Sequence, residues 1–454
     1  MPTQTLWEWD QAHVWHPFTP HSVYPNESPL MVVAGEGNYL IDSDGKRYLD
    51  GVSSIWCNTF GHRKKEIDEA IKAQLDRIAH STFLGNSGDR AVELAHRLAE
   101  IAPEGLNKVF YSDNGSTAVE IAVKMALQFW QQQPDESQKK RNRFLAFGNA
   151  YHGDTVGSVS VGGIDLFHER FKPLLFEVIR SPSPYCYRCP LGKRPESCQT
   201  ECFEEFEKLL EEKGSEVAAV VLEPGFQGAS GLITLPKDFL TRVAQATQRS
   251  GALLVLDEVA AGMGRSGKMF ACETEGVIPD FLCIAKGLTG GYLPLAATLT
   301  HQRIFDAFLA PPEEGKTFFH GHTYTGNALG AAAAVATLDL FESEEILNRL
   351  PEKIEFLRGQ LMRLKDLPGV GDIRQFGLAV GIELVMDRET REPYPSCERR
   401  AMRVCGHAVE RGVFLRPLGD VVILMPPLSI TEEEIKRLID AVESGVRTCL
   451  SDAR

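Results

Sequence analysis

Residues 252–258, Ala-Leu-Leu-Val-Leu-Asp-Glu, show the two features from which the fold class can be predicted. The apolar run 252–256 suits a strand buried on both faces of a parallel sheet, and the two acids mark its abrupt end. Similar runs occur at 109–111, 143–147, 218–222 and 281–284, with longer helix-like segments between them. This alternation predicts an α/β fold, with helices on both sides of a mostly parallel sheet.

The two ends of the chain have a different pattern from the middle. Residues 37–51 predict a hairpin, with strands at 38–42 and 46–50 joined by a Ser-Asp-Gly turn. After about residue 340 we expect helices and short strands, including 382–385 and 421–425. We therefore predict a large central domain at residues 61–335. A smaller α/β domain would combine residues 1–60 with residues 336–454.

Composition excludes several classes of protein. The chain has 454 residues, of which 43% are hydrophobic and 24% charged, which is typical of globular proteins. Its formal charge of −14 argues against general nucleic-acid binding, which depends on cationic surface. The longest apolar stretch, around residues 328–338, is too short to span a membrane. The first ten residues lack a basic region followed by an apolar one, so we expect a cytoplasmic protein.

Three segments, each placed after a predicted strand, carry candidate chemistry. The first is Ser-Asp-Asn-Gly-Ser-Thr at residues 112–117, just before a predicted helix. Gly115 lets the backbone approach a ligand, while Ser116 and Thr117 can cap the helix and present hydroxyls. The free N–H groups at a helix N-terminus favour a phosphate. Alone, the segment is also typical of an ordinary helix cap.

The second and third segments supply an acid and an amine. Asp257 ends the strand at 252–256, where a carboxylate can face a cationic ring nitrogen or form a structural ion pair. Lys286 lies between the strand at 281–284 and a Gly-rich loop. Shielding from water lowers the pKa of a lysine and makes its amine a nucleophile for a carbonyl carbon. Alone, Lys286 is also typical of a surface lysine at a strand end.

Together the three segments match the requirements of pyridoxal 5′-phosphate. The lysine binds the cofactor aldehyde covalently, the carboxylate keeps the pyridine nitrogen protonated, and the helix N-terminus anchors the phosphate. The run at 257–267, with Lys286 in Ala-Lys-Gly, resembles the class III aminotransferases, which are fold-type I pyridoxal-phosphate enzymes. Further matching segments extend the resemblance over most of the chain: 15–19, 51–56, 151–155, 320–327 and 416–419.

The resemblance implies catalytic roles for three residues. Lys286 would bind the cofactor and move the proton during transfer, and Asp257 would pair with the pyridine nitrogen. Tyr151 would lie against one face of the ring, with Val259 on the other. The resemblance thus also implies the fold-type I architecture, with a large cofactor-binding domain and a smaller domain from both termini.

The resemblance implies further contacts around the cofactor. Gly115 and Ser116 would bind its phosphate. Thr323 would reach the phosphate in the neighbouring subunit, which makes a homodimer part of the active site. Glu223 and Gln227 would support the polar edge of the ring.

The substrate side rests on three further positions. Arg416 stands in an otherwise apolar segment, and a planar guanidinium can grip a carboxylate with two hydrogen bonds. The resemblance makes that the carboxylate of 8-amino-7-oxononanoate, which the enzymes most like this chain convert to 7,8-diaminononanoate in biotin biosynthesis. Trp56 would line the channel for the acyl chain, or simply pack in the core. Phe18 would lie near the amino donor.

The resemblance leaves the amino donor open between S-adenosylmethionine and L-lysine. Relatives that use S-adenosylmethionine usually have Tyr after the Trp-His-Pro segment, whereas this chain has Phe18. Ile55 and His322 depart in the same way, and these differences resemble the branch that uses lysine. Other readings are a class III transaminase for ω-amino acids or diamines, an aminomutase, and a cofactor-binding regulator, which would need a DNA-binding segment that we do not find.

Four of the ten cysteines form a separate motif. Cys186, Cys189, Cys198 and Cys202 have the pattern Cys-x2-Cys-x8-Cys-x3-Cys in a predicted loop. Four thiolates can hold a structural Zn²⁺, but reduced thiols in a loop held by packing are the prediction we prefer. We therefore expect no metal site, with only small-molecule substrates and a second subunit as partners.

Overall fold

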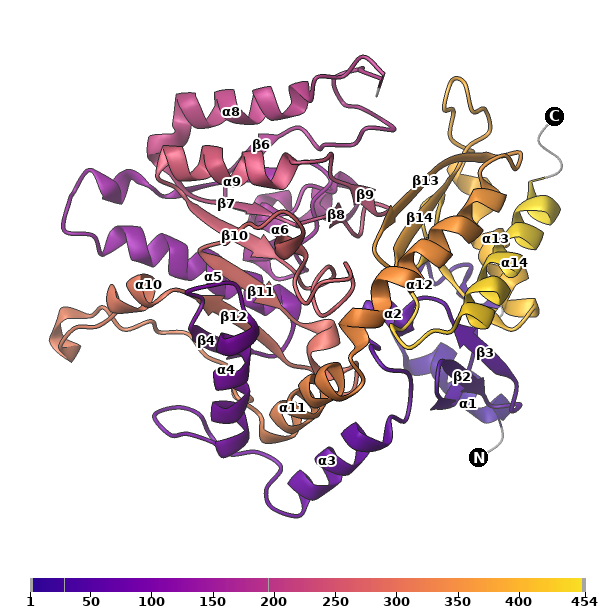
Figure 1. Ribbon diagram of the computed structural model, residues 1–454, viewed down its shortest axis with the longest axis horizontal. Helices are drawn as coiled ribbons and strands as arrows, with labels where there is room; N and C mark the ends of the chain where they lie inside the picture. The colour runs from indigo at the N-terminus through magenta and orange to yellow at the C-terminus, as the bar shows by residue number, and fades with distance from the viewer. Residues whose placement is uncertain (1–2, 28, 195, 451–454) are drawn as a thin grey trace.

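A computed structural model describes residues 3–27, 29–194 and 196–450. Its centre is a seven-stranded sheet in the order β4-β12-β11-β10-β7-β5-β6 (Figure 1). The bounds of these strands are β4 Lys108–Ser112, β5 Arg143–Phe147, β6 Val178–Ser181, β7 Val217–Leu222, β10 Leu253–Asp257, β11 Phe281–Ile284 and β12 Ala296–Thr300. All five predicted central strands are therefore confirmed.

The sheet is mostly parallel, as predicted, with one exception. Strand β12 lies between β4 and β11 and pairs antiparallel with both. Strand β12 was not predicted, and neither was β6, which forms the edge of the sheet opposite β4. Because β12 runs the opposite way, the loop that precedes it, residues 291–295, meets the carboxyl ends of the parallel strands.

Helices cover both faces of this sheet. Along β10, Leu253 and Val255 pack into one core cluster with Ala118 of α5 (Gly115–Gln131). Leu254 and Leu256 point the other way, into a second cluster that contains Val243 of α9 (Phe239–Ser250). Helix α8 (Glu201–Lys213) packs beside α9 (Figure 1). The uninterrupted apolar run of β10 follows from this double burial.

The two ends of the chain form two further four-stranded sheets. The predicted hairpin is confirmed as β2 (Tyr39–Asp42) and β3 (Arg47–Asp50), with β1 (Val32–Glu36) beside β2. Strand β15 (Val413–Phe414) pairs parallel with β3 and so joins the N-terminal and C-terminal parts of the chain.

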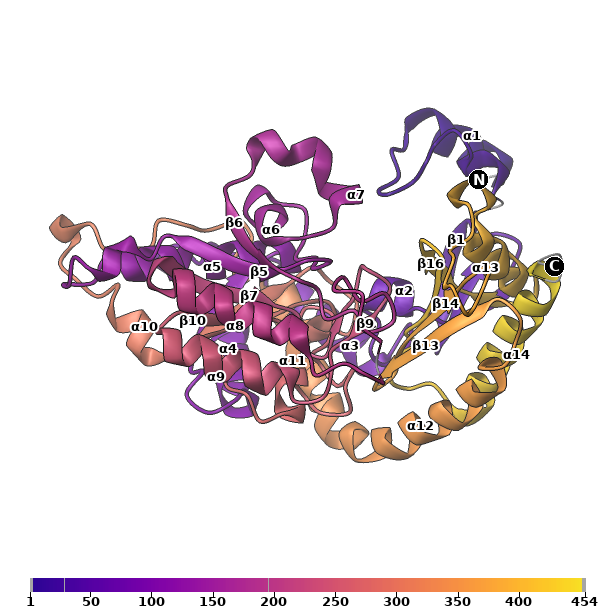
Figure 2. The same ribbon diagram turned by 90° about the horizontal axis from the view of Figure 1, so that it is seen from above.

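The second of these sheets contains both strands that were predicted in the C-terminal part. Its order is β13-β14-β17-β16, with bounds β13 Val370–Phe376, β14 Ala379–Leu384, β16 Arg416–Leu418 and β17 Val421–Leu424. Helices α12 (Ile346–Leu361), α13 (Arg400–Glu410) and α14 (Glu432–Cys449) lie along it (Figures 1 and 2).

The domain limits at residues 60 and 335 remain a prediction. The last four residues of the predicted small domain lie outside the described residues. Within the described part of the chain, every helix is too short or too polar to cross a bilayer.

Candidate active site

A cavity of about 720 Å³ opens at the carboxyl ends of the central strands. Three of its lining residues lie at strand ends. Asp257 is the last residue of β10, Glu223 follows β7, and Lys286 comes two residues after β11. Parallel sheets bind their ligands at this edge, where side chains from successive strands converge. The structure thus brings the predicted acid and the predicted amine into one cavity.

Lys286 lies in this cavity with its side chain half-buried. Burial lowers the pKa of its amine, and the negative charge of Asp257 acts in the opposite direction. The amine nitrogen lies 5.5 Å from the centre of the Trp56 ring. A lysine with a lowered pKa is neutral more often at physiological pH, so it can attack a carbonyl carbon and accept a proton.

Asp257 is 5% exposed and is held by groups on two sides. One oxygen accepts a hydrogen bond from the backbone N–H of Val259 at 3.0 Å, and the other lies 2.8 Å from Nδ1 of His152. His152 was not predicted as a site residue, although it lies in the quoted segment 151–155. Its partner is 105 residues away in sequence, so only the fold reveals their contact.

The predicted phosphate site is the start of α5, but a different residue caps the helix. Asn114, not Ser116 or Thr117, is the N-cap: its side chain accepts from the N–H of Thr117 at 3.1 Å. Thr117 completes a capping box by bonding back to Asn114, because it stands three residues after the cap. Ser116 takes no part in this capping box and lines the cavity together with Gly115.

A second hydroxyl supports Ser116. Thr155 donates its N–H to Oγ of Ser116 at 2.9 Å, and its own hydroxyl donates to Glu120 at 2.7 Å. Both Ser116 and Thr155 line the cavity, and Thr155 holds the Ser116 hydroxyl beside the free N–H groups at the N-terminus of α5. This arrangement suits an anionic group such as a phosphate.

The walls beside the phosphate site are closely packed. A methyl group on Gly115 would lie 2.4 Å from a Val259 carbon, so only glycine allows this approach. Tyr151 lines the cavity and donates its hydroxyl to Asp154 at 2.6 Å. Burial raises the pKa of Tyr151 far above its ordinary value, so the phenol stays protonated.

Glu223 and Gln227 differ in how they relate to the cavity. Glu223 lines it and accepts from the N–H groups of Tyr151 at 3.0 Å and Gly228 at 2.8 Å. Burial raises the pKa of Glu223 to about 7. Gln227 is buried behind the wall, where it bonds Ser183 and Gly148.

Of the predicted substrate residues Trp56 and Phe18, one lines the cavity and the other reaches it only through an intermediate ring. Trp56 forms part of its wall. Phe18 is 57% exposed and does not line the cavity, but its ring packs edge-on against Phe167 at 5.2 Å. Phe167, in α7 (Asp165–His168), in turn lies 6.2 Å from the Tyr151 ring. Figure 2 shows α7 and the segment after α1 (Thr3–His13) approaching each other above the sheet.

Like Phe18 and Gln227, Arg416 and Thr323 lie outside the cavity lining. Arg416 is exposed on β16, and its guanidinium makes no hydrogen bond or ion pair with any described residue. Thr323 is exposed, and its carbonyl accepts from His80 at 2.8 Å. Its neighbour Tyr324 is 59% exposed and Phe319 is 81% exposed, so this segment presents apolar rings at the surface.

The four cysteines of the 186–202 motif lie around a separate cavity of about 170 Å³. Burial raises the pKa of Cys202 to about 11, so its thiol stays protonated. In the part of the chain that the structure describes, which excludes residue 195 of this loop, no three His, Cys, Asp or Glu side chains are placed to hold a metal ion.

The residues of the large cavity fit pyridoxal phosphate. The N-terminus of α5 suits the phosphate, Asp257 suits the ring nitrogen, and Lys286 is the one amine among the described lining residues. Nε2 of His152 is buried beside Asp257 without a hydrogen-bond partner in the described structure, as expected where a bound ring would complete the surroundings.

Comparison with known proteins gives one family over most of the chain. The model of the class-III aminotransferases matches residues 22–446. A curated relative from Geobacter sulfurreducens, named adenosylmethionine-8-amino-7-oxononanoate aminotransferase, is 55% identical over 98% of each chain. A relative of the same name from Methanocaldococcus jannaschii is 48% identical over 97% of this chain and 98% of its own length.

Solved structures agree with this result. The crystal structure of the Methanocaldococcus jannaschii protein has a TM-score of 0.94 and 47% identity, and the match covers 98% of this chain and 99% of that one. An (S)-enantioselective omega-transaminase from Thermomicrobium roseum has a TM-score of 0.93 at 32% identity, over 99% of both chains. The cavity described above therefore lies in a framework shared with transaminases.

Proposed function

We propose that this chain, which belongs to the class-III aminotransferase family, converts 8-amino-7-oxononanoate to 7,8-diaminononanoate in biotin biosynthesis. The cofactor of the family is pyridoxal 5′-phosphate. The observation that carries the proposal is the near full-length identity of 55% to an enzyme named for this acceptor. The convergence of Lys286 and Asp257 in one cavity supplies the chemistry.

When bound, the cofactor supplies an aldehyde that takes up the amino group and a protonated ring that accepts electrons from the substrate carbon. The residues of the chain hold the ring and move the proton. Asp257 would keep the ring nitrogen protonated, and His152 fixes the orientation of that carboxylate. Lys286 would take a proton from the donor carbon and, in the second half-reaction, return one to the acceptor carbon.

We propose S-adenosylmethionine as the amino donor, because the relatives at 48–55% identity are named for it. We expect the purified enzyme to form 7,8-diaminononanoate from S-adenosylmethionine and 8-amino-7-oxononanoate, measured by mass spectrometry. Lysine is the matched comparison, since Phe18 lacks the hydroxyl of the usual tyrosine. If product formed with lysine but not with S-adenosylmethionine, lysine would be the donor. If neither donor gave product, the proposed function would be wrong.

Arg416 would bind the carboxylate of the acceptor. Its guanidinium is unpaired among the described residues, and a hydrogen bond to a charged group contributes about 1.5–3 kcal/mol. We expect Arg416→Leu to raise KM for 8-amino-7-oxononanoate by about 10- to 100-fold, with a smaller change in kcat. Steady-state kinetics with varied acceptor measure this. Arg411→Leu, which removes an equal charge from an exposed position five residues earlier in the chain, is the control, and equal effects of the two variants would exclude this role.

We propose that the enzyme is a homodimer in which Thr323 reaches the phosphate site of the partner. Two facts support this: Thr323 does not line the cavity of its own subunit, and the segment around it exposes the rings of Phe319 and Tyr324. Large exposed apolar side chains that gather in one place mark protein interfaces. The small-molecule substrates and the second subunit are thus the proposed partners, and the cytoplasm is the proposed compartment.

A further inference from the structure

The turn that carries Trp56 has a strained backbone. Four consecutive residues, Ser53–Trp56, have φ angles of 48°, 58°, 127° and 72°. The φ of 127° belongs to Ile55, a β-branched residue in a region that only glycine occupies readily. Such a conformation persists only where the surroundings impose it, so the contacts that hold this turn need an explanation.

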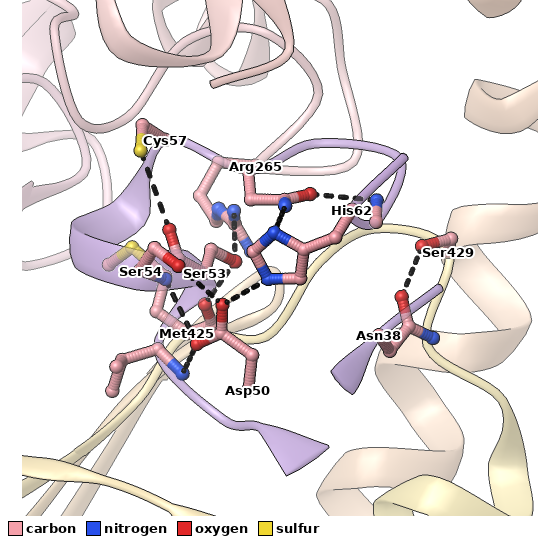
Figure 3. A network of polar contacts seen from close by, with 12 residues as sticks. Asn38, Asp50, Ser53, Ser54, Cys57, His62, Arg265, Met425 and Ser429 are labelled. Carbon is pink, nitrogen blue, oxygen red and sulfur yellow. Dashed lines mark hydrogen bonds and ion pairs between the residues drawn. The ribbon is translucent and has the colours of Figure 1, made fainter. Parts of the chain in front are cut away.

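Asp50 holds the first half of the turn. Its carboxylate is fully buried at the end of β3. One oxygen accepts from the N–H of Ser54 at 2.9 Å, and the other accepts from the Ser54 hydroxyl at 2.8 Å and faces Nε2 of His62 at 3.0 Å (Figure 3). Both carboxylate oxygens are therefore occupied, and both bind the positive-φ residue Ser54.

The protonation of the His62 ring follows from its neighbours. The N–H of Gly61 donates to the amide oxygen of Asn58 at 2.7 Å, which fixes the orientation of that amide. The Asn58 NH₂ group therefore donates to Nδ1 of His62 at 3.0 Å. The hydrogen of the neutral ring must then be on Nε2, from which it is donated to Asp50. The hydrogen bonds from Asn58 to His62 and from His62 to Asp50 thus run in one direction.

A second clamp holds the other side of the turn. The Ser53 hydroxyl donates to the carbonyl of Met425 at 2.6 Å, just after β17 (Figure 3). The buried guanidinium of Arg265 donates to the carbonyl of Pro426, and its Nη2 lies 3.5 Å from the Ser53 hydroxyl. Burial lowers the pKa of Arg265 to about 10, and no described acid pairs with it.

The position of this turn determines the position of groups in the active site. The Trp56 ring lies 5.5 Å from the Lys286 amine, and a methyl group on Gly228 would come within 3.0 Å of that ring. Just beyond the turn, Thr59 donates to the carbonyls of Gly287 and Gly290 in the loop that carries Lys286. A shift of the turn would therefore move a wall of the cavity relative to the amine.

We infer that His62 and Asp50 are positioning residues for the acceptor. They hold the strained turn that fixes the Trp56 ring beside Lys286, and so determine how well a long-chain keto acid fits the cavity. Neither residue lines the cavity, so each acts through Trp56 and not by touching the substrate. The role of Trp56 as a substrate wall rests on the proposed function.

The first test separates substrate binding from turnover. We expect His62→Leu to raise KM for 8-amino-7-oxononanoate about tenfold, with less than about a threefold fall in kcat, since small misplacements of positioning groups have large effects. His62→Gln keeps an N–H that can reach Asp50 and should stay within about threefold of the wild type. His407→Leu removes another half-buried histidine, bonded to Ser444, and should leave KM unchanged. Equal KM changes in the two leucine variants would overturn the inference.

The second test addresses the strain directly. Glycine adopts the Ile55 conformation without steric cost, so we expect Ile55→Gly to recover at least about half of the KM increase caused by His62→Leu. In the wild-type background the same change should have a smaller effect of its own. Additive effects of the two substitutions would show that His62 does not act through the strained turn.

A third measurement does not depend on the proposed function. The fluorescence of Trp56 is obtained in the apo-enzyme as the difference between each protein and the same protein carrying Trp56→Phe. We expect acrylamide to quench this signal about twice as strongly in His62→Leu as in the wild type, because a released turn exposes the ring. In His407→Leu the quenching should equal that of the wild type. An unchanged quenching constant would overturn the positioning role. If the wild-type enzyme did not convert 8-amino-7-oxononanoate, only the proposed function would be overturned.

Discussion

Replacing Lys286 with alanine is expected to lower the rate of amino transfer by about 10⁴-fold or more, because in the proposed function the same amine would serve as nucleophile and as proton carrier. Among the described residues of the cavity, Lys286 supplies the one amine, so no neighbour can take over. Stopped-flow absorbance in a single half-reaction measures the rate. The absorbance band of the lysine-bound cofactor should disappear in the same variant.

Chemical rescue provides the control for this prediction. A small amine such as methylamine should restore part of the proton transfer in Lys286→Ala, because the substitution leaves space at the position of the side chain. If the variant kept both its turnover and the absorbance band, Lys286 could not be the catalytic amine, and the proposed chemistry would fail with it.

The same variant tests whether two subunits share each site. When Lys286→Ala and Thr323→Ala chains are co-expressed and the mixed dimer is isolated, one of its two sites has an intact Lys286 and receives an intact Thr323 from the partner. We expect activity well above that of either parent variant. Activity no higher than the average of the two parents would mean that Thr323 acts within its own subunit or not at all.

Asp257→Asn is expected to lower kcat by about 10²- to 10⁴-fold, since breaking a buried charge pair costs about 3–5 kcal/mol. The asparagine oxygen can still accept from the N–H of Val259, so the local backbone should be retained. What is lost is the negative charge that would keep the ring nitrogen protonated. Single-turnover rates with each substrate measure the effect, and the amount of bound cofactor shows whether the site remains loaded.

Glu258→Gln is the matched control for Asp257→Asn. Glu258 is the next residue and is also buried, but it accepts from the N–H groups of Ala271 and Cys272 and does not line the cavity. Burial raises its pKa to about 7, so its amide analogue is a modest change in charge near neutral pH. We expect kcat of the folded variant to stay within about tenfold of the wild type. Equal losses in both variants would mean that the charge of Asp257 has no special role.

Local sequence patterns were enough to predict the central strands and the residues at their ends. The runs 143–147 and 281–284 coincide with β5 and β11, and the residues that follow the strands, including Asp257 and Lys286, do converge in one cavity. These features could be predicted because each depends on a short local pattern. An apolar run of strand length specifies burial, and parallel strands bring their carboxyl ends to the same edge.

Contacts between segments that are distant in the sequence could be found only in the folded chain. His152 lies against Asp257 across 105 residues, β12 enters the sheet antiparallel, and His62 fixes a strained turn through Asp50. The tertiary structure also places Arg416 and Thr323 outside the cavity lining. Such features depend on which elements meet in space, and a local pattern of residues contains no information about that. Local patterns were therefore enough to propose which groups react, whereas the fold shows which groups hold them in place.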